Sequence, residues 1–364
     1  MSDPAPAPTP GPRSRTGDPE LDRRLVDLLD AIGVRANRDQ LLDLLATVVR
    51  LADDRTDRLD LKIANVALRE MVDGFEVFAP YRHRRKITMF GSARTLPSDP
   101  LYAQARALAA LLAAHDWSTV TGAGPGIMAA GLEGAGADHA FGINIRLPFE
   151  QAANEFIASD PKLVSMKYFF TRKLLLIKES AGYAVLPGGF GTLDEAFELL
   201  TLLQTGKAEP APVVLLEVEG GSYWKGWAHF LEAEVVRRGL VSTRDECFYR
   251  IADSVEEAAA ELLGFYRNYH SVRWVGDTLL MRLINPPTAE EVGALSGEFA
   301  DVIHEPIQLL PGPLAAERRA EDFPHLARLA LRFDRMSYAR LRQLVDAVNQ
   351  LPSAPPAPVI TPLA

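Results

Sequence analysis

Short apolar runs alternate with helical stretches from Lys86 to about Tyr269, and this alternation constrains the fold more than any other feature of the chain. Each run is too short for a helix, whereas the intervals between runs carry apolar residues at helical spacing. Such alternation is typical of βαβ units, in which helices cover both faces of a parallel sheet. The sequence therefore predicts an α/β core, Rossmann-like and doubly wound, with a mainly parallel sheet.

The two flanks of this core follow different patterns. Apolar residues recur at helical spacing between Leu21 and Met71, with a break at Gly33, which predicts a pair of amphipathic N-terminal helices. After Arg273 the order strand, helix, strand, strand, helix predicts a small C-terminal α+β extension. That extension is either an oligomerisation or packing element or a regulatory lobe, and the residues do not favour the second.

These patterns set the expected elements and domain boundaries. In the core, strands are predicted at 87–90, 118–121, 140–145, 181–186, 213–217 and 248–251, with helices at 100–114, 126–136, 166–179, 192–204, 223–238 and 255–269. In the extension, strands are predicted at 278–283, 303–309 and 327–333, with helices at 289–300 and 338–349. The expected division is a disordered tail at 1–18, a helical segment at 19–80, the Rossmann-like α/β domain at 81–270, the α+β unit at 271–352 and a disordered tail at 353–364.

Charge and residue usage argue against several classes of function. The net charge of −9 disfavours nucleic acid as a partner. No run approaches the roughly 20 apolar residues of a membrane helix, so a cytoplasmic protein without membrane contact is expected. Cys247 is the single cysteine, and its apolar neighbours indicate a buried side chain rather than a reactive thiol. The seven histidines are scattered without ligand spacing, so neither a metal nor a cofactor is predicted.

Three glycine-rich turns follow predicted strands, and in a doubly wound sheet such turns lie at the carboxyl edge, where ligands bind. They are Gly91-Ser92-Ala93-Arg94, Gly122-Ala123-Gly124-Pro125-Gly126 and Pro187-Gly188-Gly189-Phe190-Gly191-Thr192. The second turn lacks the G-x-G-x-x-G spacing of a dinucleotide site, and the Gly-Lys-Ser/Thr of a P-loop does not occur. A ligand with a single phosphate group is therefore expected.

The third turn is the strongest candidate for binding that phosphate. Its glycines let the backbone approach a ligand, and a helix that begins near Thr192 points its free N–H groups toward the same place. Thr192 either donates its hydroxyl to the phosphate or caps the helix, and capping alone explains a threonine at this position.

Three carboxylates, Asp194, Glu195 and Glu198, lie in the first turns of the helix behind the third turn. Acidic residues there complement the helix dipole and need no further role. However, a carboxylate beside a bound phosphate is repelled, so its presence suggests a task such as activating water or holding ribose hydroxyls. This favours a function for Glu195 over the other two.

Two cations lie on the predicted helix 166–179, whose other residues are unusually apolar. Arg172 and Lys173 each extend either to solvent or into the pocket. Arg172 is the better pocket candidate, because its planar guanidinium matches phosphate and carboxylate groups.

Taken together, these segments resemble the LONELY GUY family of cytokinin riboside 5′-monophosphate phosphoribohydrolases, long misnamed lysine decarboxylases. The family signature P-G-G-x-G-T-x-x-E is matched completely from Pro187 to Glu195, and the family's upstream Arg-Lys pair matches Arg172-Lys173. The other matches within residues 85–252 are Phe90-Gly91-Ser92-Ala93-Arg94, the turn Gly-x-Gly-Pro-Gly-Ile-Met ending at Met128, and Gly142-Ile143-Asn144-Ile145-Arg146-Leu147-Pro148 followed by Glu150-Gln151.

The resemblance implies a hydrolase that cleaves the base from a nucleoside 5′-monophosphate, either AMP or an N6-modified AMP. It implies catalysis by Arg172 and Glu195, with the carboxylate stabilising the ribosyl charge and activating water, as carboxylates do in glycoside hydrolysis. The nucleotide-binding residues expected with it are Gly188, Gly189, Gly191, Thr192, Gly91, Ser92, Gly124 and Lys173.

Two further expectations concern the base and the assembly. An apolar extension of the base pocket would accept an isopentenyl group, and its candidates are Phe169, Phe170 and Phe190. The resemblance also implies a homodimer or a larger homo-oligomer, with the apolar helix around Phe169 and Leu175 as part of the interface. Light scattering tests this second expectation.

Three other functions are weighed against this one. A nonenzymatic nucleotide sensor on the same fold would bind a nucleotide without cleaving it. A decarboxylase dependent on pyridoxal phosphate needs a Schiff-base lysine and a coloured cofactor. A nicotinamide dehydrogenase lacks its fingerprint in this sequence.

Overall fold

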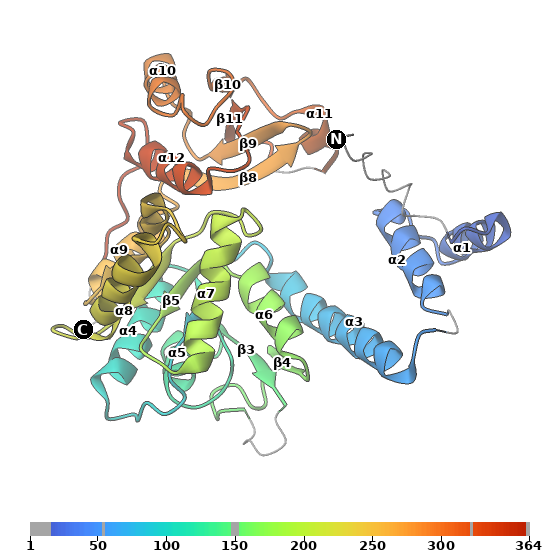
Figure 1. Cartoon of the computed structure of the whole chain (residues 1–364), viewed down its shortest axis with the longest axis horizontal. Coiled ribbons are helices and arrows are strands. Elements are labelled where there is room, and N and C mark those ends of the chain that lie inside the picture. The colour runs from blue at the N-terminus through green and yellow to red at the C-terminus, as the bar shows by residue number, and fades with distance from the viewer. Residues whose placement is uncertain (1–15, 53–54, 147–152, 321–322, 362–364) are drawn as a thin grey trace, which may run out of the picture. The chain divides into compact units, whose positions relative to one another are not determined.

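The computed structural model describes residues 16–52, 55–146, 153–320 and 323–361 (Figure 1). The chain divides into two compact units, residues 1–69 and 70–364. The expected tail at 1–18 therefore lies almost entirely outside the described residues, as do the motif residues from Leu147 to Gln151. No helix in the described ranges is long and apolar enough to cross a bilayer.

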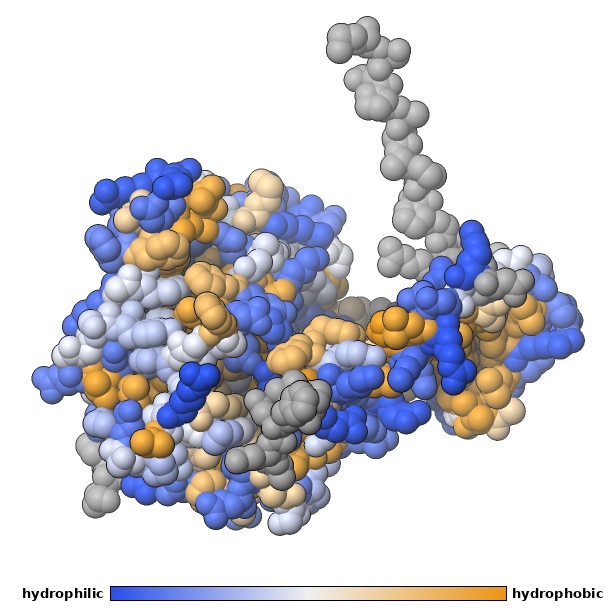
Figure 2. Space-filling view, turned by 60° about the horizontal axis from the view of Figure 1, so that its bottom comes forward, coloured by the Kyte–Doolittle hydropathy of each residue, from blue (hydrophilic) through white to orange (hydrophobic). Residues whose placement is uncertain are grey.

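The first unit contains the predicted pair of amphipathic helices, α1 (Pro19–Ala31) and α2 (Arg38–Arg50). Asp18 caps α1, because its side chain accepts hydrogen bonds from the first free N–H groups of the helix. A third helix, α3 (Arg58–Phe78), continues into the second unit. Apolar residues of α1 and α2 remain at the surface (Figure 2). They are Leu21, Val26, Leu28, Leu41, Leu44 and Val48.

The second unit is built on a seven-stranded sheet whose strands all run parallel. The strands are β1 (Lys86–Phe90), β2 (Ser118–Thr121), β3 (Ala140–Ile145), β4 (Leu163–Met166), β5 (Gly182–Val185), β6 (Val213–Leu216) and β7 (Arg250–Ala252). Their order is β4-β3-β2-β1-β5-β6-β7. This confirms the predicted Rossmann-like, doubly wound sheet.

Helices cover both faces of this sheet (Figure 1). On one face lie α4 (Pro100–Ala114), α5 (Ile127–Ala135) and α9 (Val255–Gly264). On the other lie the end of α3, α6 (Phe169–Lys178), α7 (Phe190–Gln204) and α8 (Tyr223–Phe230), which continues as a π-helix over Leu231–Val236. Side chains of β1 alternate between the two cores: Ile87 and Met89 pack on the first face and Phe90 on the second.

The topology fixes where a ligand can bind. From β1 the chain winds outward through β2 and β3 to β4, and then crosses back to β5 on the other side of β1. The loops after β1 and β5 therefore diverge, and they leave a crevice at the carboxyl ends of the two strands.

The appended unit forms a four-stranded antiparallel sheet in the order β10-β11-β9-β8. Its strands are β8 (Tyr269–Val275), β9 (Thr278–Leu283), β10 (Gln308–Leu310) and β11 (Ala327–Leu331). Its helices are α10 (Ala289–Glu298), α11 (Ala315–Ala320) and α12 (Tyr338–Gln350). The α+β prediction is thus confirmed in kind. The strand predicted from Ile303 begins instead at Gln308, and Ile303 makes only an isolated bridge to Phe333.

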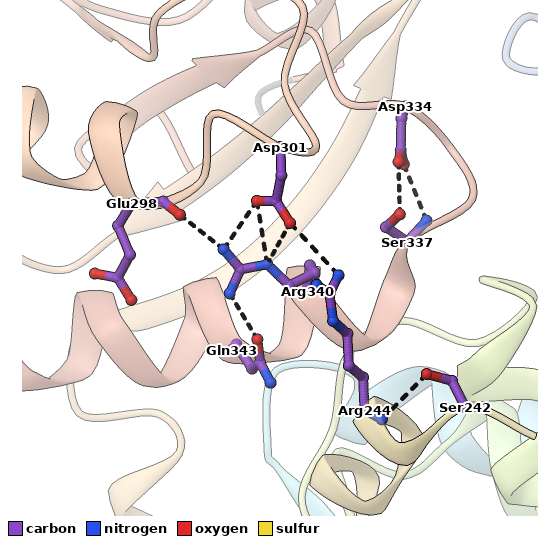
Figure 3. Close-up of polar contacts among 8 residues, drawn as sticks. All are labelled: Ser242, Arg244, Glu298, Asp301, Asp334, Ser337, Arg340 and Gln343. Carbon is purple, nitrogen blue, oxygen red and sulfur yellow. Dashed lines mark hydrogen bonds and ion pairs between the residues drawn. The ribbon is translucent and has the colours of Figure 1, made fainter.

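The extension contacts the α/β core through a polar cluster around Asp301 (Figure 3). Arg340 of α12 donates to Asp301 at 2.9 Å and to the carbonyl of Glu298 at 2.7 Å, and it stacks over Phe299. Arg244 lies on a 3₁₀ segment of the core, Thr243–Phe248, and reaches the same carboxylate at 3.4 Å. Asp301 therefore links the C-terminal extension to the α/β core.

The prediction of a disordered tail at 353–364 is wrong for its described part, 353–361. The backbone N–H of Ser353 donates to Glu291 at 3.0 Å, and its carbonyl accepts from Asn285 at 3.0 Å. Arg267 donates to the carbonyl of Pro355, and Ile360 packs against the core. Prolines remove N–H donors here, but the carbonyls of Ser353 and Pro355 still find partners in neighbouring elements, which hold this part of the segment against the domain.

Candidate functional site

The three glycine-rich turns meet at the crevice between β1 and β5. The N–H of Ser92 donates to the carbonyl of Pro187 at 3.2 Å, which joins the first turn to the third. The N–H of Ile127 donates to the carbonyl of Ser92 at 3.1 Å, which joins the second turn to the first. Together with Arg172, Glu195 and Tyr223 they line a cleft of about 1140 Å³, large enough for a nucleotide.

The glycines of these turns divide into two kinds. Gly126 has φ +68°, and a Cβ there would lie 2.3 Å from the carbonyl oxygen of Ser92; at Gly188 a Cβ would lie 2.2 Å from Oγ1 of Thr192. These two positions need glycine for packing within the protein. At Gly189 and Gly191 a Cβ would meet no atom within 4 Å. Glycine there leaves bare backbone facing open space, as close approach by a ligand requires.

Helix α7 presents its free N-terminus to this cleft. The helix begins at Phe190 with Gly189 as its N-cap, two residues earlier than predicted. Its first N–H groups have no acceptor within the helix, and they carry the positive end of its dipole. Thr192 lies inside the first turn and is buried, so the alternative that it caps the helix is wrong. The arrangement suits a phosphate group.

Arg172 and Glu195 meet at the wall of the cleft. Nη2 of Arg172 donates to Oε1 of Glu195 at 3.1 Å, and the two side chains are only 12% and 13% exposed. Gly122 leaves room for the guanidinium, because a Cβ there would lie 3.3 Å from its Nη1. The Nε of Arg172 is buried and makes no hydrogen bond with the described residues. The guanidinium also lies over the ring of Phe169 at 5.3 Å.

Burial sets the ionisation of this carboxylate. Removal from water raises the pKa of Glu195 to about 7, and the nearby charges of Arg172 and Lys173 offset only part of that rise. A carboxyl group with a pKa near neutrality exchanges protons readily at physiological pH. Such a group in a cleft is a candidate general base or acid.

Lys173 lies outside the cleft that Arg172 and Glu195 line. Its ammonium pairs with Asp194 at 2.6 Å and with Glu198 at 2.8 Å, and it is not among the residues that line the cleft. Burial lowers the pKa of Lys173, but the hydrogen bonds that its ammonium donates to these two carboxylates outweigh burial and raise it. The structure therefore does not bring Lys173 to the cleft as expected, and it gives Asp194 and Glu198 a partner of their own.

The remaining predicted site residues converge on the cleft. They are Gly91, Ser92, Gly124, Gly188, Gly189, Gly191, Thr192, Arg172 and Glu195. Groups of three or more His, Cys, Asp or Glu side chains that could hold a metal ion are not found among the described residues.

Sequence reasoning missed two residues that line the cleft and one that supports it. Tyr223 lines it, and its hydroxyl donates to the carbonyl of Gly188 at 2.6 Å. Asn144 lines it from the end of β3, and Asn154 supports the second turn by donating to the carbonyl of Gly124 at 2.8 Å. Asn144 lies at the carboxyl end of β3 and Tyr223 follows β6, and that position at the carboxyl edge was the available signal.

Comparison with known proteins finds similar sequences. A family model described as "Possible lysine decarboxylase" matches residues 125–262. A cytokinin riboside 5′-monophosphate phosphoribohydrolase of Arabidopsis thaliana is 33% identical over 101 residues, which cover 28% of this chain and 46% of the relative. A bifunctional cytokinin biosynthesis protein of Fusarium pseudograminearum is 34% identical over 97 residues, which cover 25% of this chain and 19% of that protein. The chain thus spans less than half the length of these relatives.

Solved structures also match. The molybdenum cofactor carrier protein of Chlamydomonas reinhardtii is 20% identical with a TM-score of 0.35, and the match covers 49% of this chain and 94% of that one. The likeness to the family comes from the sequence matches, and the segment matched by the family model contains the signature from Pro187 to Glu195. Through residues 125–262 the chain is similar to the LONELY GUY family of cytokinin riboside 5′-monophosphate phosphoribohydrolases.

Proposed function

We propose that this protein hydrolyses the N-glycosidic bond of a nucleoside 5′-monophosphate, AMP or an N6-modified AMP, to give the free base and ribose 5-phosphate. The named phosphoribohydrolases among its relatives support a hydrolase. The observation that carries the proposal is the buried Glu195, with a pKa of about 7, bound to Arg172 beside the open N-terminus of α7.

The 5′-phosphate anchors the substrate. It binds at the first turn of α7, where the backbone at Gly189 and Gly191 is open and Thr192 supplies a hydroxyl. The ribose then lies toward Glu195, which is one turn further along the same helix. A substrate without the phosphate loses this anchor, so adenosine is a poor substrate.

The reaction follows from that placement. The bond between the base nitrogen and the ribosyl carbon breaks, its electron pair leaves with the base, and the ribose acquires oxocarbenium character. The Glu195 carboxylate stabilises this charge and takes a proton from the water that attacks the same carbon. The departing base takes up one proton, so that the water is divided between the two products and Glu195 returns to its ionised form. Arg172 favours the ionised form of Glu195 and holds the phosphate or ribose side of the substrate.

If Glu195 acts as a carboxylate, base release depends on pH in a defined direction. Glu195 is protonated below its pKa of about 7, so kcat/KM for AMP rises with pH and reaches a plateau above about 7. Quantifying released adenine between pH 5 and 9 measures this profile. A rate that falls as pH rises through 7 would instead indicate a general acid, and an inflection only near 6 would report the second ionisation of a phosphate.

Two of the three phenylalanines expected to form the apolar part of the base pocket lie at the cleft. Phe169 and Phe190 line the cleft, whereas Phe170 lines a separate cavity. Phe190 is 95% exposed, which is exceptional for such a large apolar side chain. We expect Phe190→Ala to lower kcat/KM for isopentenyl-AMP by about 10-fold relative to AMP, since it removes apolar contact with the prenyl group. Equal losses with both substrates, in parallel assays, would remove Phe190 from prenyl recognition.

One chromatographic assay tests the proposal as a whole. The protein is incubated with AMP, isopentenyl-AMP, GMP, CMP and adenosine, and the free base is quantified. Release from a monophosphate but not from adenosine supports a phosphoribohydrolase and ranks the bases. If no free base is released although AMP still binds, the protein is a nucleotide sensor rather than an enzyme.

We also propose a homodimer or a larger homo-oligomer. On α6 the large apolar side chains of Phe169, Phe170 and Leu174 are about half exposed, and a second copy would cover them. Leu175, expected at such an interface, is fully buried within its own unit and cannot take part. Light scattering at micromolar concentration tests the assembly, and a monomeric mass would refute it.

A further inference from the structure

Glu70 is a buried carboxylate outside the family motifs. It lies on α3, ahead of the segment that matches the family model, and is only 3% exposed. Its side chain accepts hydrogen bonds from the backbone N–H of Lys167 at 2.5 Å and from the hydroxyl of Thr171 at 2.7 Å. The N–H of Tyr168 lies at 3.5 Å, and Arg146 approaches Oε1 at 3.7 Å.

These donors mark the N-terminal end of α6. Tyr168 is the N-cap of that helix, and its side chain makes no capping hydrogen bond. Glu70 therefore accepts, from another helix, the N-cap N–H that a glutamate at position N3 accepts in a capping box, and Thr171, which occupies N3 here, donates its hydroxyl to Glu70 instead. Its charge also complements the positive end of the α6 dipole.

A second contact fixes α6 against α3 one turn further on. A Cβ at Gly74 would lie 2.1 Å from Cδ1 of Leu175, so the backbone of α3 lies directly on that side chain. Thr171 and Leu175 are both fully buried and lie one turn apart on the same face of α6. The two contacts therefore set the rotation of α6 about its axis.

Arg172 directly follows Thr171 on this helix. Its contact with Glu195 at 3.1 Å depends on the rotation of α6, because successive helical side chains point about 100° apart. We propose that Glu70 is a positioning residue: it clamps the N-terminus of α6 so that Arg172 stays against Glu195. The link to catalysis rests on the proposed function, whereas the link to the Arg172–Glu195 contact does not.

The test follows the ionisation of Glu195 rather than activity alone. Arg172 is the largest influence that lowers the pKa of Glu195, so displacing its guanidinium raises that pKa further. The pKa of Glu195 is measured by following the ¹³C NMR signals of the glutamate carboxyls as the pH is varied. The Glu195 signal is the one that disappears in the Glu195→Gln variant. Arg172→Ala gives the value reached when the guanidinium is absent.

Four variants separate positioning from general stability. Glu70→Ala should raise the pKa of Glu195 toward the Arg172→Ala value and lower kcat by about 10- to 100-fold. Glu70→Gln should restore part of both, since its amide oxygen can still accept from the N–H of Lys167 and its NH2 group can donate to the Thr171 hydroxyl. Thr171→Val, which removes one donor with little change of shape, should shift the pKa in the same direction by less. Glu76→Ala, an exposed carboxylate on the same helix, should change neither.

The outcomes are decisive even if a variant misfolds or the activity is absent. A folded Glu70→Ala protein in which Glu195 titrates as in the wild type would overturn the proposal. If Glu70→Ala fails to fold, Thr171→Val decides, and a wild-type titration there would also overturn it. A wild-type protein that releases no base would refute the proposed function, but the titrations would still show whether Glu70 positions Arg172.

Discussion

Glu195→Gln is expected to slow base release from AMP by about 10²–10⁴-fold, the contribution of a positioned general base. The amide keeps the volume of the side chain and can still accept the hydrogen bond from Arg172, which is 3.1 Å away. It can neither carry the negative charge that stabilises the ribosyl carbon nor accept a proton from water. The loss should therefore fall on kcat, measured as adenine released at saturating AMP, while AMP still binds.

The same helix offers a matched control. Glu198 lies close to Glu195 along α7, but its carboxylate pairs with Lys173 at 2.8 Å and does not line the cleft. Glu198→Gln should therefore leave kcat within about twofold of the wild type, because surface pairs of this kind contribute little. If both variants retain full activity, Glu195 is not the base, whereas equal losses in both would indicate a disturbed helix.

Glu317→Ala is expected to lower the free energy of unfolding by about 3–5 kcal/mol, the cost of removing one partner from a buried ionic cluster. Glu317 on α11 is fully buried and accepts from Arg282 at 2.8 Å and from Arg328 at 2.9 Å. The two arginines lie directly opposite each other on β9 and β11. Without Glu317, two like charges face each other inside the appended unit, and urea unfolding measures the loss.

The direction of the pH effect can be stated for this cluster. Burial alone raises the pKa of Glu317, but hydrogen bonds from Arg282 and Arg328 outweigh burial and hold that pKa below its usual value. A carboxylate whose pKa is lowered on folding stabilises the protein above its unfolded pKa, and that stabilisation is lost as the pH falls through the folded pKa. The difference in stability between wild type and Glu317→Ala should therefore shrink in acid.

An exposed carboxylate of the same unit provides the control. Glu305 lies on the surface of the extension, and Glu305→Ala should change the unfolding free energy by no more than about 0.5 kcal/mol. A Glu317→Ala protein that is as stable as Glu305→Ala would show that the arginines find other compensation. The stability of the appended unit would then come from its apolar core rather than from the buried ionic cluster.

Local pattern was sufficient for most strands and helices, and its failures have physical causes. The missed strand β4 alternates buried and exposed residues over only four positions, which is too short to separate from a loop. The missed strand β8 carries a register shift between Tyr269 and Ser271 where it pairs with β9. A bulge breaks the period of two, so its residues do not alternate as a regular strand does.

The sequence by itself determined the doubly wound sheet, the three glycine-rich turns and their meeting at one edge, because parallel strands direct all their carboxyl ends to the same side. Only the tertiary structure decided that Arg172 meets Glu195 while the adjacent Lys173 turns to Asp194 and Glu198. It alone showed the burial that raises the pKa of Glu195 to about 7. The direction of a helical side chain and its exposure to water depend on how the helix is rotated against its neighbours, and those contacts come from residues distant in the chain.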